Sequence, residues 1–387
     1  MVMIMIFILG AILFISLVLV HEWGHFIAAR KNGVDVEEFG LGFPPQAKII
    51  TKSKGTVYSL NWLPLGGFVR LKGEHDADTG KGSFGAASLK VKMLIMLAGV
   101  GMNLLTAYVL FTVVALMGMP NLSKTLGFEQ FTVASDTKVI RDYDNKGVII
   151  IASVVEGSPA AKAGLAANDE VVSINGVPID DPDMLGKQTS SNAGKEVDVA
   201  FRRGESFDVV RLQLNDTSPY LGVSSYSDEF GVQLRRSTWS APIVAAGVMK
   251  DITIATFKGL GNALKGLGSL IAGAMTGNRE ARQAGQTAAS SQVAGPVGIV
   301  QTLYEGSRLG FGFMLFIIAV ISLTLAIMNI LPIPALDGGR LYTMLGFRLF
   351  KKPLNQKTEE KIQIVGFSIV MMLVLLTTVV DISRITS

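Results

Sequence analysis

Four long apolar stretches constrain this chain more than any other feature of its sequence. They run from about Met3 to Ala29, from Met93 to Met119, from Phe311 to Leu331 and from Ile362 to Val380. A helix needs about 20 apolar residues to cross the hydrocarbon core of a bilayer, and each stretch is about that long. Only 17% of the 387 residues are charged, which is low for a soluble domain. The sequence therefore predicts a polytopic α-helical membrane protein with about four transmembrane helices.

A cleaved signal peptide is the alternative interpretation of the first stretch. No Lys or Arg precedes its apolar run, and no small-x-small cleavage site ends it. We therefore expect this stretch to be retained as a membrane span.

Basic residues predict the orientation of these spans. Lys and Arg are concentrated between Arg30 and Lys92, and again between Arg340 and Lys361. Positive loops stay in the cytoplasm, so both termini and the segment from Asn121 to about Arg308 are expected outside. The net charge of +4 is modest and no basic stripe is interleaved with aromatics. Nucleic acid is therefore not expected as a partner, whereas the lipid bilayer is.

The outer segment contains the pattern of a small α+β domain. Strand-like runs and a short helix alternate from Gly147 to Ile179, and a hairpin turning at Arg203–Gly204 follows. The run "VxxGSPAAKAGLxxxDxVxxINGxxI" resembles a PDZ domain of the bacterial, circularly permuted kind. Such a domain binds an extended peptide or a protein C-terminus at a sheet edge. A small α+β domain without a ligand is the alternative. Between Ser240 and Gly277 the chain predicts an amphipathic surface helix rather than a fifth span.

A β element is predicted in the loop between the first two spans. The segment from Ala47 to Glu74 has a hairpin turn at Lys54–Gly55, followed by alternating residues and then by a break at Pro64–Gly67. A sheet this short needs a surface to pack against, and the nearby membrane is one candidate. We therefore expect a membrane-associated β-hairpin over residues 40–74.

Two histidines and a glutamate form an HExxH motif, His21-Glu22-Trp23-Gly24-His25, at the end of the first apolar stretch. Residues four apart lie on one face of a helix, so both imidazoles can bind one metal ion, and Glu22 can take a proton from bound water. The alternative is a structural pair of histidines between helices. Such a pair would carry a desolvation cost in an apolar segment without an evident gain. The chain contains no cysteine, which excludes thiolate ligands.

A catalytic zinc ion has three protein ligands and one open position, so a third ligand must lie elsewhere. The candidates are His75, Glu37, Glu38 and Asp337. Asp337 is favoured because it ends "NILPIPALDGGR", where a span breaks at two prolines. Broken backbone at membrane depth is tolerated only where protein or a water cavity receives it. The two glycines that follow allow close backbone approach or positive φ.

These motifs together resemble a known family. HExxH in the first span, "NxxPxPxLDGG" at the third and a PDZ-like unit between the second and third are similar to the PDZ-containing site-2 proteases. More closely they resemble the bacterial RIP (RseP-like) intramembrane zinc metalloproteases, as do "FGLGFPP", "YSLNWLPLGGFVRLKGE" and "GPVGIV". The chain departs from the family at Val100, where a proline is usual, and in having one evident PDZ-like unit where some members have two.

The resemblance implies a role for each motif residue. Zn²⁺ would be held by His21, His25 and Asp337, and Glu22 would be the general base. Substrate would be bound by a set of residues from the two motif loops, namely Asn329, Gly66, Gly67, Pro332 and Pro334.

The implied reaction is hydrolysis of peptide bonds in or near the transmembrane segments of single-span membrane proteins. Anti-sigma-factor-like regulators and remnant signal peptides are the substrate types that the resemblance implies. The protein would be a multi-pass protein of the bacterial inner membrane, with the PDZ-like domain outside and the active site toward the cytoplasm. A membrane transporter or ion relay using the His, Glu and Asp side chains, and a non-catalytic PDZ scaffold, are the alternatives. The expected domains are a membrane core over 1–120, the PDZ-like domain over 125–216, the outer helix and linker over 217–308, and a second membrane core over 309–387.

Overall fold

The computed structural model describes residues 2–141, 148–179, 182–204, 206–228, 233–276, 278 and 295–386. These residues form two compact units. Unit 1 consists of Met1–Lys138 and Arg236–Ser387, and unit 2 is Val139–Arg235. The strands β4 (Lys138–Arg141) and β11 (Leu234–Arg236) lie where the chain passes from one unit to the other and back.

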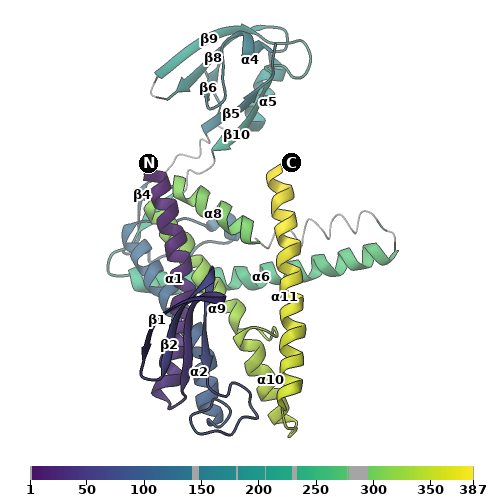
Figure 1. Ribbon diagram of the computed structural model, residues 1–387. Helices are drawn as coiled ribbons and strands as arrows, with labels where there is room; N and C mark the ends of the chain where they lie inside the picture. The colour runs from purple at the N-terminus through teal and green to yellow at the C-terminus, as the bar shows by residue number, and fades with distance from the viewer. Residues whose placement is uncertain are drawn as a thin grey trace. The chain divides into compact units, whose positions relative to one another are not determined.

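Within the described part of unit 1, three helices are long and apolar enough to cross a membrane. They are α1 (Val2–Lys31), α2 (Leu89–Met117) and α9 (Phe311–Ile330). α2 packs against both of the others (Figure 1). Gly24 of α1 allows close contact between α1 and α2. Any larger residue there would place a Cβ 2.5 Å from the carbonyl oxygen of Ala98 on α2. Small residues at such contacts are typical of membrane helix pairs.

The fourth expected span falls within α11 (Gln356–Thr386). This helix presents large apolar side chains to the outside, including those of Ile364, Phe367 and Met372. Asp381 joins it to the N-terminus of α8 (Pro296–Arg308), because its carboxylate accepts a hydrogen bond of 2.8 Å from the amide of Gly298. The structure thus supports a membrane protein, while a fourth crossing stays a prediction.

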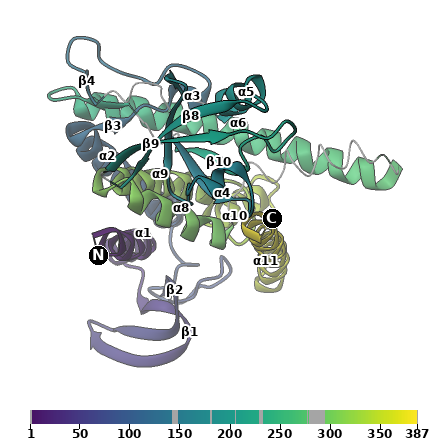
Figure 2. The same ribbon diagram turned by 90° about the horizontal axis from the view of Figure 1, so that it is seen from above.

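The helix expected between Ser240 and Gly277 is present as α6 (Ala241–Thr276). Its first turns pack into the apolar core formed with α2 and α9, through residues such as Val244 and Val248. Beyond these turns it extends away from the other helices and across the direction of α1 and α11 (Figures 1 and 2). The expected linker that follows lies outside the described residues, apart from Asn278.

The predicted β-hairpin is confirmed as β1 (Val36–Ser53) and β2 (Thr56–Leu71), with the turn at Lys54–Gly55 in left-handed conformation at φ 48° and 84°. Residues 38–41 of β1 pair with residues 57–60 of β2 on one side and with residues 67–70 on the other. The Pro64–Gly67 interruption is where β2 turns back, with Gly66 at φ +90°. The two strands therefore make a small curved sheet that projects beyond α1 (Figure 2).

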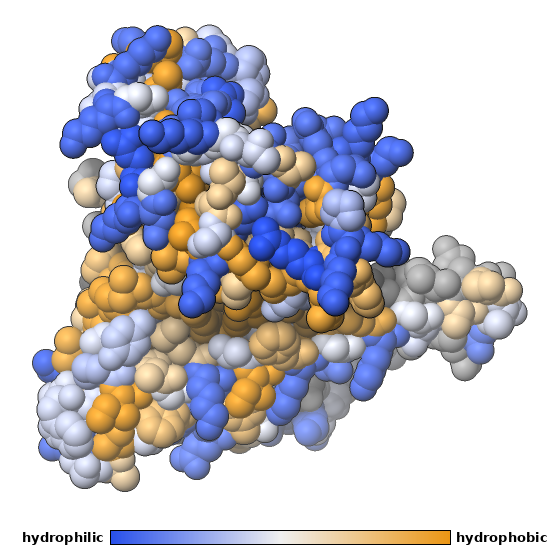
Figure 3. Space-filling view, turned by 90° about the horizontal axis from the view of Figure 1, so that it is seen from below, coloured by the Kyte–Doolittle hydropathy of each residue, from blue (hydrophilic) through white to orange (hydrophobic). Residues whose placement is uncertain are grey.

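The remaining short elements of unit 1 are β3 (Met119–Pro120), α3 (Ser123–Leu126) and α10 (Asp337–Leu349). Large apolar side chains lie on the outside of α1, α2, α11 and the β1–β2 sheet. In the view from below, such side chains cover broad areas of the surface between hydrophilic ones (Figure 3). Exposed apolar surface of this extent is a marker of membrane contact.

Unit 2 is an antiparallel sheet of order β10–β5–β6–β8–β9, with β7 paired to β6, around its own apolar core. Its strands and helices are β5 (Val148–Val154), α4 (Pro159–Lys162), β6 (Glu170–Ile174), β7 (Val177–Pro178), α5 (Pro182–Ser191), β8 (Glu196–Arg203), β9 (Ser206–Gln213) and β10 (Val223–Asp228). Ser158 caps α4, and Gly164 follows it at φ +77°. The predicted alternation of strands with a short helix is confirmed.

Candidate metal centre

His21 and His25 lie one turn apart near the C-terminal end of α1, so both imidazoles project from the same face of the helix. Both side chains are buried, and their Nε2 atoms are 3.2 Å apart. A buried pair of imidazoles with both Nε2 atoms converging is an arrangement suited to one shared ion.

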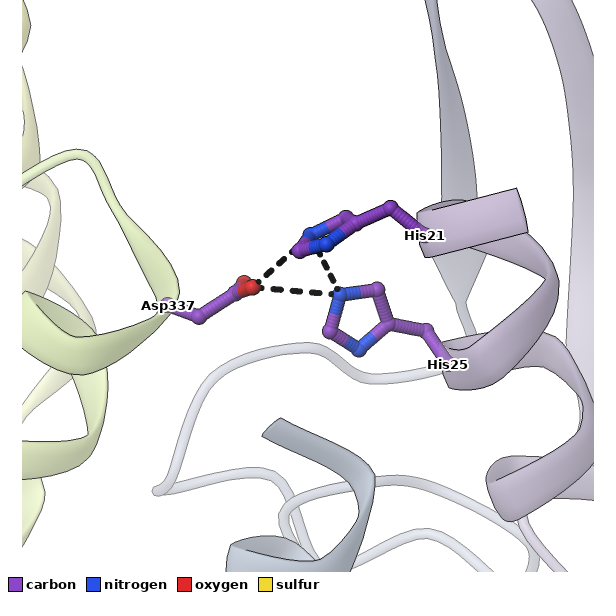
Figure 4. Close-up of side chains that lie close together, drawn as sticks. All are labelled: His21, His25 and Asp337. Atoms are coloured by element: carbon purple, nitrogen blue, oxygen red, sulfur yellow. Dashed lines mark hydrogen bonds and ion pairs between the residues drawn. The ribbon is translucent and has the colours of Figure 1, made fainter. Parts of the chain in front are cut away.

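Asp337 reaches the same point from the start of α10, which follows α9 in the chain. Its Oδ2 atom lies 3.0 Å from Nε2 of His21 and 3.2 Å from Nε2 of His25. Figure 4 shows the three side chains pointing toward one another. Of the groups in the described residues, these three are the ones whose ligand atoms cluster closely enough to hold a metal ion.

The turn between α9 and α10 places Asp337 through close backbone packing. A Cβ on Gly338 would lie 2.4 Å from the carbonyl oxygen of Leu331, and one on Gly339 would lie 2.0 Å from that of Ile333. Neither glycine has positive φ, whereas Ala335 in the same turn does, at 82°. Close approach, rather than conformational freedom, is therefore why two glycines follow the aspartate.

The spacing of the three ligand atoms fits a metal ion. Ligands at 2.0–2.1 Å from a tetrahedral zinc ion are separated by about 3.3 Å, close to the 3.0–3.2 Å found here. Oδ2 of Asp337 is buried and has no hydrogen-bond partner among the described residues. A buried carboxylate oxygen without a partner is costly, and an ion at this point would satisfy it. Two nitrogen ligands and one oxygen, with a position left open, match a catalytic zinc site.

The charge state of Asp337 also suits metal binding. Burial raises the pKa of its carboxyl, but the interactions with the two imidazoles lower this pKa by a larger amount. The pKa of Asp337 therefore lies below its usual range. The carboxylate is therefore ionised, which is the form that binds a metal.

Glu22 lies beside the cluster, next to His21 on α1, and interacts electrostatically with all three ligands. Its carboxylate accepts a hydrogen bond from the backbone amide of Val69 on β2. Gly67 of the same strand also approaches it, since a Cβ there would lie 3.5 Å from Cγ of Glu22. The last segment of β2 thus runs alongside this side chain and helps to orient it.

The other candidate ligands have different partners. Glu38 is buried within the β1–β2 sheet, where Ser59 donates a hydrogen bond of 2.5 Å and Arg70 forms an ion pair of 2.5 Å. Glu37 also pairs with Arg70, at 3.5 Å. His75 lies 3.6–3.8 Å from Glu359 and Glu360 on α11. None of the three joins the cluster, so Asp337 is the third ligand that the geometry supports.

The expected substrate-binding residues lie on α9, in the turn after it and on β2. Asn329 is half-buried on the last turn of α9, and its side chain makes no hydrogen bond within the described residues. Pro332 is exposed in the turn that follows, and Pro334 touches Gly366 of α11. Gly66 and Gly67 belong to the segment of β2 beside Glu22.

A cavity of about 400 Å³ adjoins the cluster, and Asp337 forms part of its wall. Polar or charged side chains make up seven of its ten lining residues, namely Asp337, Glu74, His75, Arg340, Glu359, Glu360 and Gln363. Of the three ligands, Asp337 belongs to this lining, so the cavity adjoins the centre at that residue.

Sequence reasoning missed the part played by α2. Ile95 and Asn103 contact the two imidazoles by hydrogen bonds, and Gly99 lies directly beneath them. These residues are four apart, and Asn103 is a polar residue in an apolar span. That spacing and that polarity are the signals from which the role of α2 could have been suspected.

Comparisons with known proteins cover almost the whole chain. The model of peptidase family M50 matches residues 9–373. The protein Cj1068 of Campylobacter jejuni, whose name assigns it provisionally to the zinc metalloproteases, is 30% identical over 97% of this chain and 93% of its own. The zinc metalloprotease RasP of Shouchella clausii is 25% identical over 97% of this chain and 98% of its own.

Solved structures match a smaller part. The PDZ domain of the SdrC-like protein from Listeria monocytogenes covers 23% of this chain and 97% of its own, at 19% identity and a TM-score of 0.20. At that score the likeness carries no argument. The PDZ interpretation of unit 2 therefore rests on its sequence motif and its strand order.

Proposed function

The chain belongs to peptidase family M50, and from this premise we propose that it is a zinc metalloprotease of the site-2 type whose metal is held by His21, His25 and Asp337. The observation that carries this assignment is the convergence of three ligand atoms, Nε2 of each histidine and Oδ2 of Asp337, to within 3.2 Å of one another. A transporter or a non-catalytic scaffold would have no need for such a site.

Glu22 is the general base of the proposed reaction. A zinc ion, when bound, would polarise the scissile carbonyl and lower the pKa of a water molecule toward about 7. Glu22 takes the proton of the attacking water and returns it to the amine that leaves. The amide of Val69 holds the carboxylate in place, and the adjoining cavity supplies the water.

The substrates in this proposal are single-span membrane proteins, with regulators of the anti-sigma-factor type and remnant signal peptides as the expected kinds. A helical substrate must first be unwound, because its amides are engaged in internal hydrogen bonds. The last segment of β2, which includes Gly66 and Gly67, offers an edge next to Glu22 to which an extended substrate can be added. The free amide of Asn329 would bind the unwound backbone, and Pro332 and Pro334 would shape the opposite wall.

The arrangement in the membrane is part of the same proposal. The C-terminal ends of α1 and α9 meet at the metal ligands, so both helices end on one side, and the basic loops assign that side to the cytoplasm. The Ile362–Val380 part of α11 is the fourth span, and its exposed apolar side chains support contact with lipid. α6 lies along the outer surface. The protein would sit in the bacterial inner membrane.

Unit 2, Val139–Arg235, is proposed as an extracytoplasmic PDZ domain that includes β10, beyond the expected end of the domain at residue 216. Strand β10 is at the edge of its sheet and next to α5. An open edge beside a helix is suited to an extended peptide or a protein C-terminus.

Co-expression with tagged single-span proteins tests this function. The native chain should release a cleaved fragment, whereas Glu22→Gln should bind about one zinc ion per chain and leave the substrate intact, a loss of roughly 10²- to 10⁴-fold in rate. Normal cleavage by the Glu22→Gln chain would rule out the proposed mechanism. Absence of zinc from the native chain would rule out the metal site.

A further inference from the structure

We propose that one face of α2, made of Ile95, Gly99 and Asn103, fixes the tautomers of both histidines and keeps the space for the metal clear. This inference rests on the proposed metal site and extends it to residues that never touch the ion. The three residues are four apart, so they lie in a row along the side of α2 that faces the centre.

The ring of His25 is fixed by the backbone of Ile95. Its Nδ1 atom is 2.7 Å from the carbonyl oxygen of Ile95, in a buried contact. A carbonyl oxygen only accepts hydrogen bonds, so Nδ1 carries the proton. In the neutral ring Nε2 then presents its lone pair, and that atom is the one 3.2 Å from Asp337.

The ring of His21 meets a side chain at the equivalent position. The Nδ2 atom of Asn103 lies 3.3 Å from Nδ1 of His21, and Oδ1 of the same amide is buried with no hydrogen-bond partner among the described residues. If Nε2 of His21 is to bind a metal, the ring proton must reside on Nδ1, and this N–H needs an acceptor. A half-turn of the Asn103 amide exchanges Nδ2 for Oδ1, so that Nδ1–H of His21 donates to Oδ1.

Asn103 is itself firmly placed. It is 1% exposed, and its carbonyl accepts a hydrogen bond of 2.8 Å from the hydroxyl of Ser322 on α9. α9 leads directly into the turn that carries Asp337. The two imidazoles are therefore tied to α2 by a backbone and a side-chain contact, and Ser322 ties α2 to the helix that precedes Asp337, as expected of groups that orient metal-binding imidazoles.

Gly99 provides the space between these two contacts. A Cβ at this position would lie 2.4 Å from Nε2 of His25 and 2.7 Å from Nε2 of His21. It would therefore collide with the two atoms that face the ion. Gly101 lies two residues further along α2, and a Cβ built on it would have no atom within 4 Å.

The test compares two substitutions of Asn103 in the purified full-length protein. Asn103→Leu keeps the size and removes the acceptor, so the zinc affinity measured by chelator competition should fall by about 10- to 100-fold. Asn103→Asp keeps an acceptor and should stay within a few-fold of the native affinity. Thr112→Ala is the control, because the Thr112 hydroxyl donates a hydrogen bond of 2.8 Å to the carbonyl of Tyr108 within α2 and contacts neither imidazole, so its zinc affinity should be unchanged.

A second readout reports the tautomer directly. The chain has only 3 histidines, so ¹⁵N labelling of histidine gives few signals, and a His75→Gln variant identifies one of them. In zinc-free native protein His21 should be protonated at Nδ1, and Asn103→Leu should shift it toward the Nε2-protonated form. An unchanged tautomer, or native zinc affinity in Asn103→Leu, would overturn the inference.

Failure of the inference can be told apart from failure of the proposed function. If His21→Ala binds zinc as tightly as the native chain, the metal site itself is wrong. If His21→Ala loses zinc while Asn103→Leu keeps it, the site is right and α2 does not orient it.

Discussion

Unit 1 contains two clusters of buried ionisable groups that are satisfied to very different degrees. In the ion network, Lys92 is fully buried and pairs with Asp76, which also pairs with Arg348 at 3.2 Å. Glu359 accepts from the amide of Asp76 at 3.0 Å and pairs with Arg340 at 3.4 Å. Each charge of this network has an opposite charge or a donor beside it.

The metal centre is the reverse case. Its ligand atoms converge at 3.0–3.2 Å, yet Oδ2 of Asp337 and Oδ1 of Asn103 lack partners among the described residues. A buried network without a ligand is stable only when complete. We infer from this difference that the ion network serves the fold, whereas the centre is built for a group that binds to it.

The largest expected effect comes from removing a ligand. Asp337→Ala should lower zinc affinity by roughly 10³-fold, on the assumption that three ligands share a binding free energy on the order of 10–16 kcal/mol. Cleavage should be lost with the metal, and the variant should unfold at nearly the temperature of the zinc-free native chain, because both lack the stabilisation that bound zinc gives. Metal analysis and thermal unfolding of the two zinc-free proteins check both. A much lower unfolding temperature of the variant would remove the distinction between the two clusters.

The ion network should respond in the opposite way. Lys92→Met leaves Asp76 buried without its closest cation, and should destabilise the protein by about 3–5 kcal/mol while zinc affinity stays native. Lys90→Met is the matched control, because Lys90 is exposed one half-turn away. Thermal unfolding in detergent measures the difference. Equal unfolding temperatures for the two variants would contradict the structural role of the network.

Two glycines of α2 sharpen the comparison within a single helix. Gly99→Ala places a methyl group against both Nε2 atoms and should weaken zinc binding by about tenfold or more, as expected from displaced ligands. Gly101→Ala meets open space and should leave zinc binding native, with a gain of up to about 1 kcal/mol from helix propensity. Chelator competition measures the zinc affinity of both variants. Similar affinities would refute the proposal that Gly99 keeps the space for the metal clear.

A buried pair in unit 2 extends the comparison with a smaller effect. Asp169 is 1% exposed and holds Arg203 at 2.6 Å. Burial raises the pKa of Asp169, but the hydrogen bonds and charge of Arg203 outweigh it and lower this pKa. A lowered pKa stabilises the fold above the ordinary aspartate pKa of about 3.9, and this stability is lost as the pH falls through the folded value.

In Arg203→Met, the free energy of unfolding should therefore fall less steeply below about pH 4 than it does in the native chain. Hydrogen exchange of the amides in β6 and β8, compared with the native chain at each pH, measures it. Arg211→Met is the control, since its partner Asp198 is 41% exposed and exposed pairs contribute little. If both variants show the same acid dependence, burial of the Asp169 pair has no special effect.

Local patterns were sufficient for much of the fold. The lengths of three apolar stretches predicted α1, α2 and α9, because membrane thickness sets the length of a span. The Lys54–Gly55 turn predicted the hairpin, because Gly55 adopts positive φ without steric cost, as found there. The return of β2 beside residues 38–41 could not be predicted, since it depends on pairing between distant segments.

For the centre, the sequence by itself determined the pair of imidazoles on one helical face and singled out Asp337 by the prolines and glycines around it. Helical periodicity and backbone chemistry are local, so they can be read from neighbouring residues. Only the tertiary structure decided that Asp337 meets His21 and His25, that Glu37, Glu38 and His75 are engaged elsewhere, and that α2 lies beneath the ligands. These outcomes depend on which helix faces pack together. Packing is determined by contacts throughout unit 1, so it cannot be read from any single stretch of the sequence.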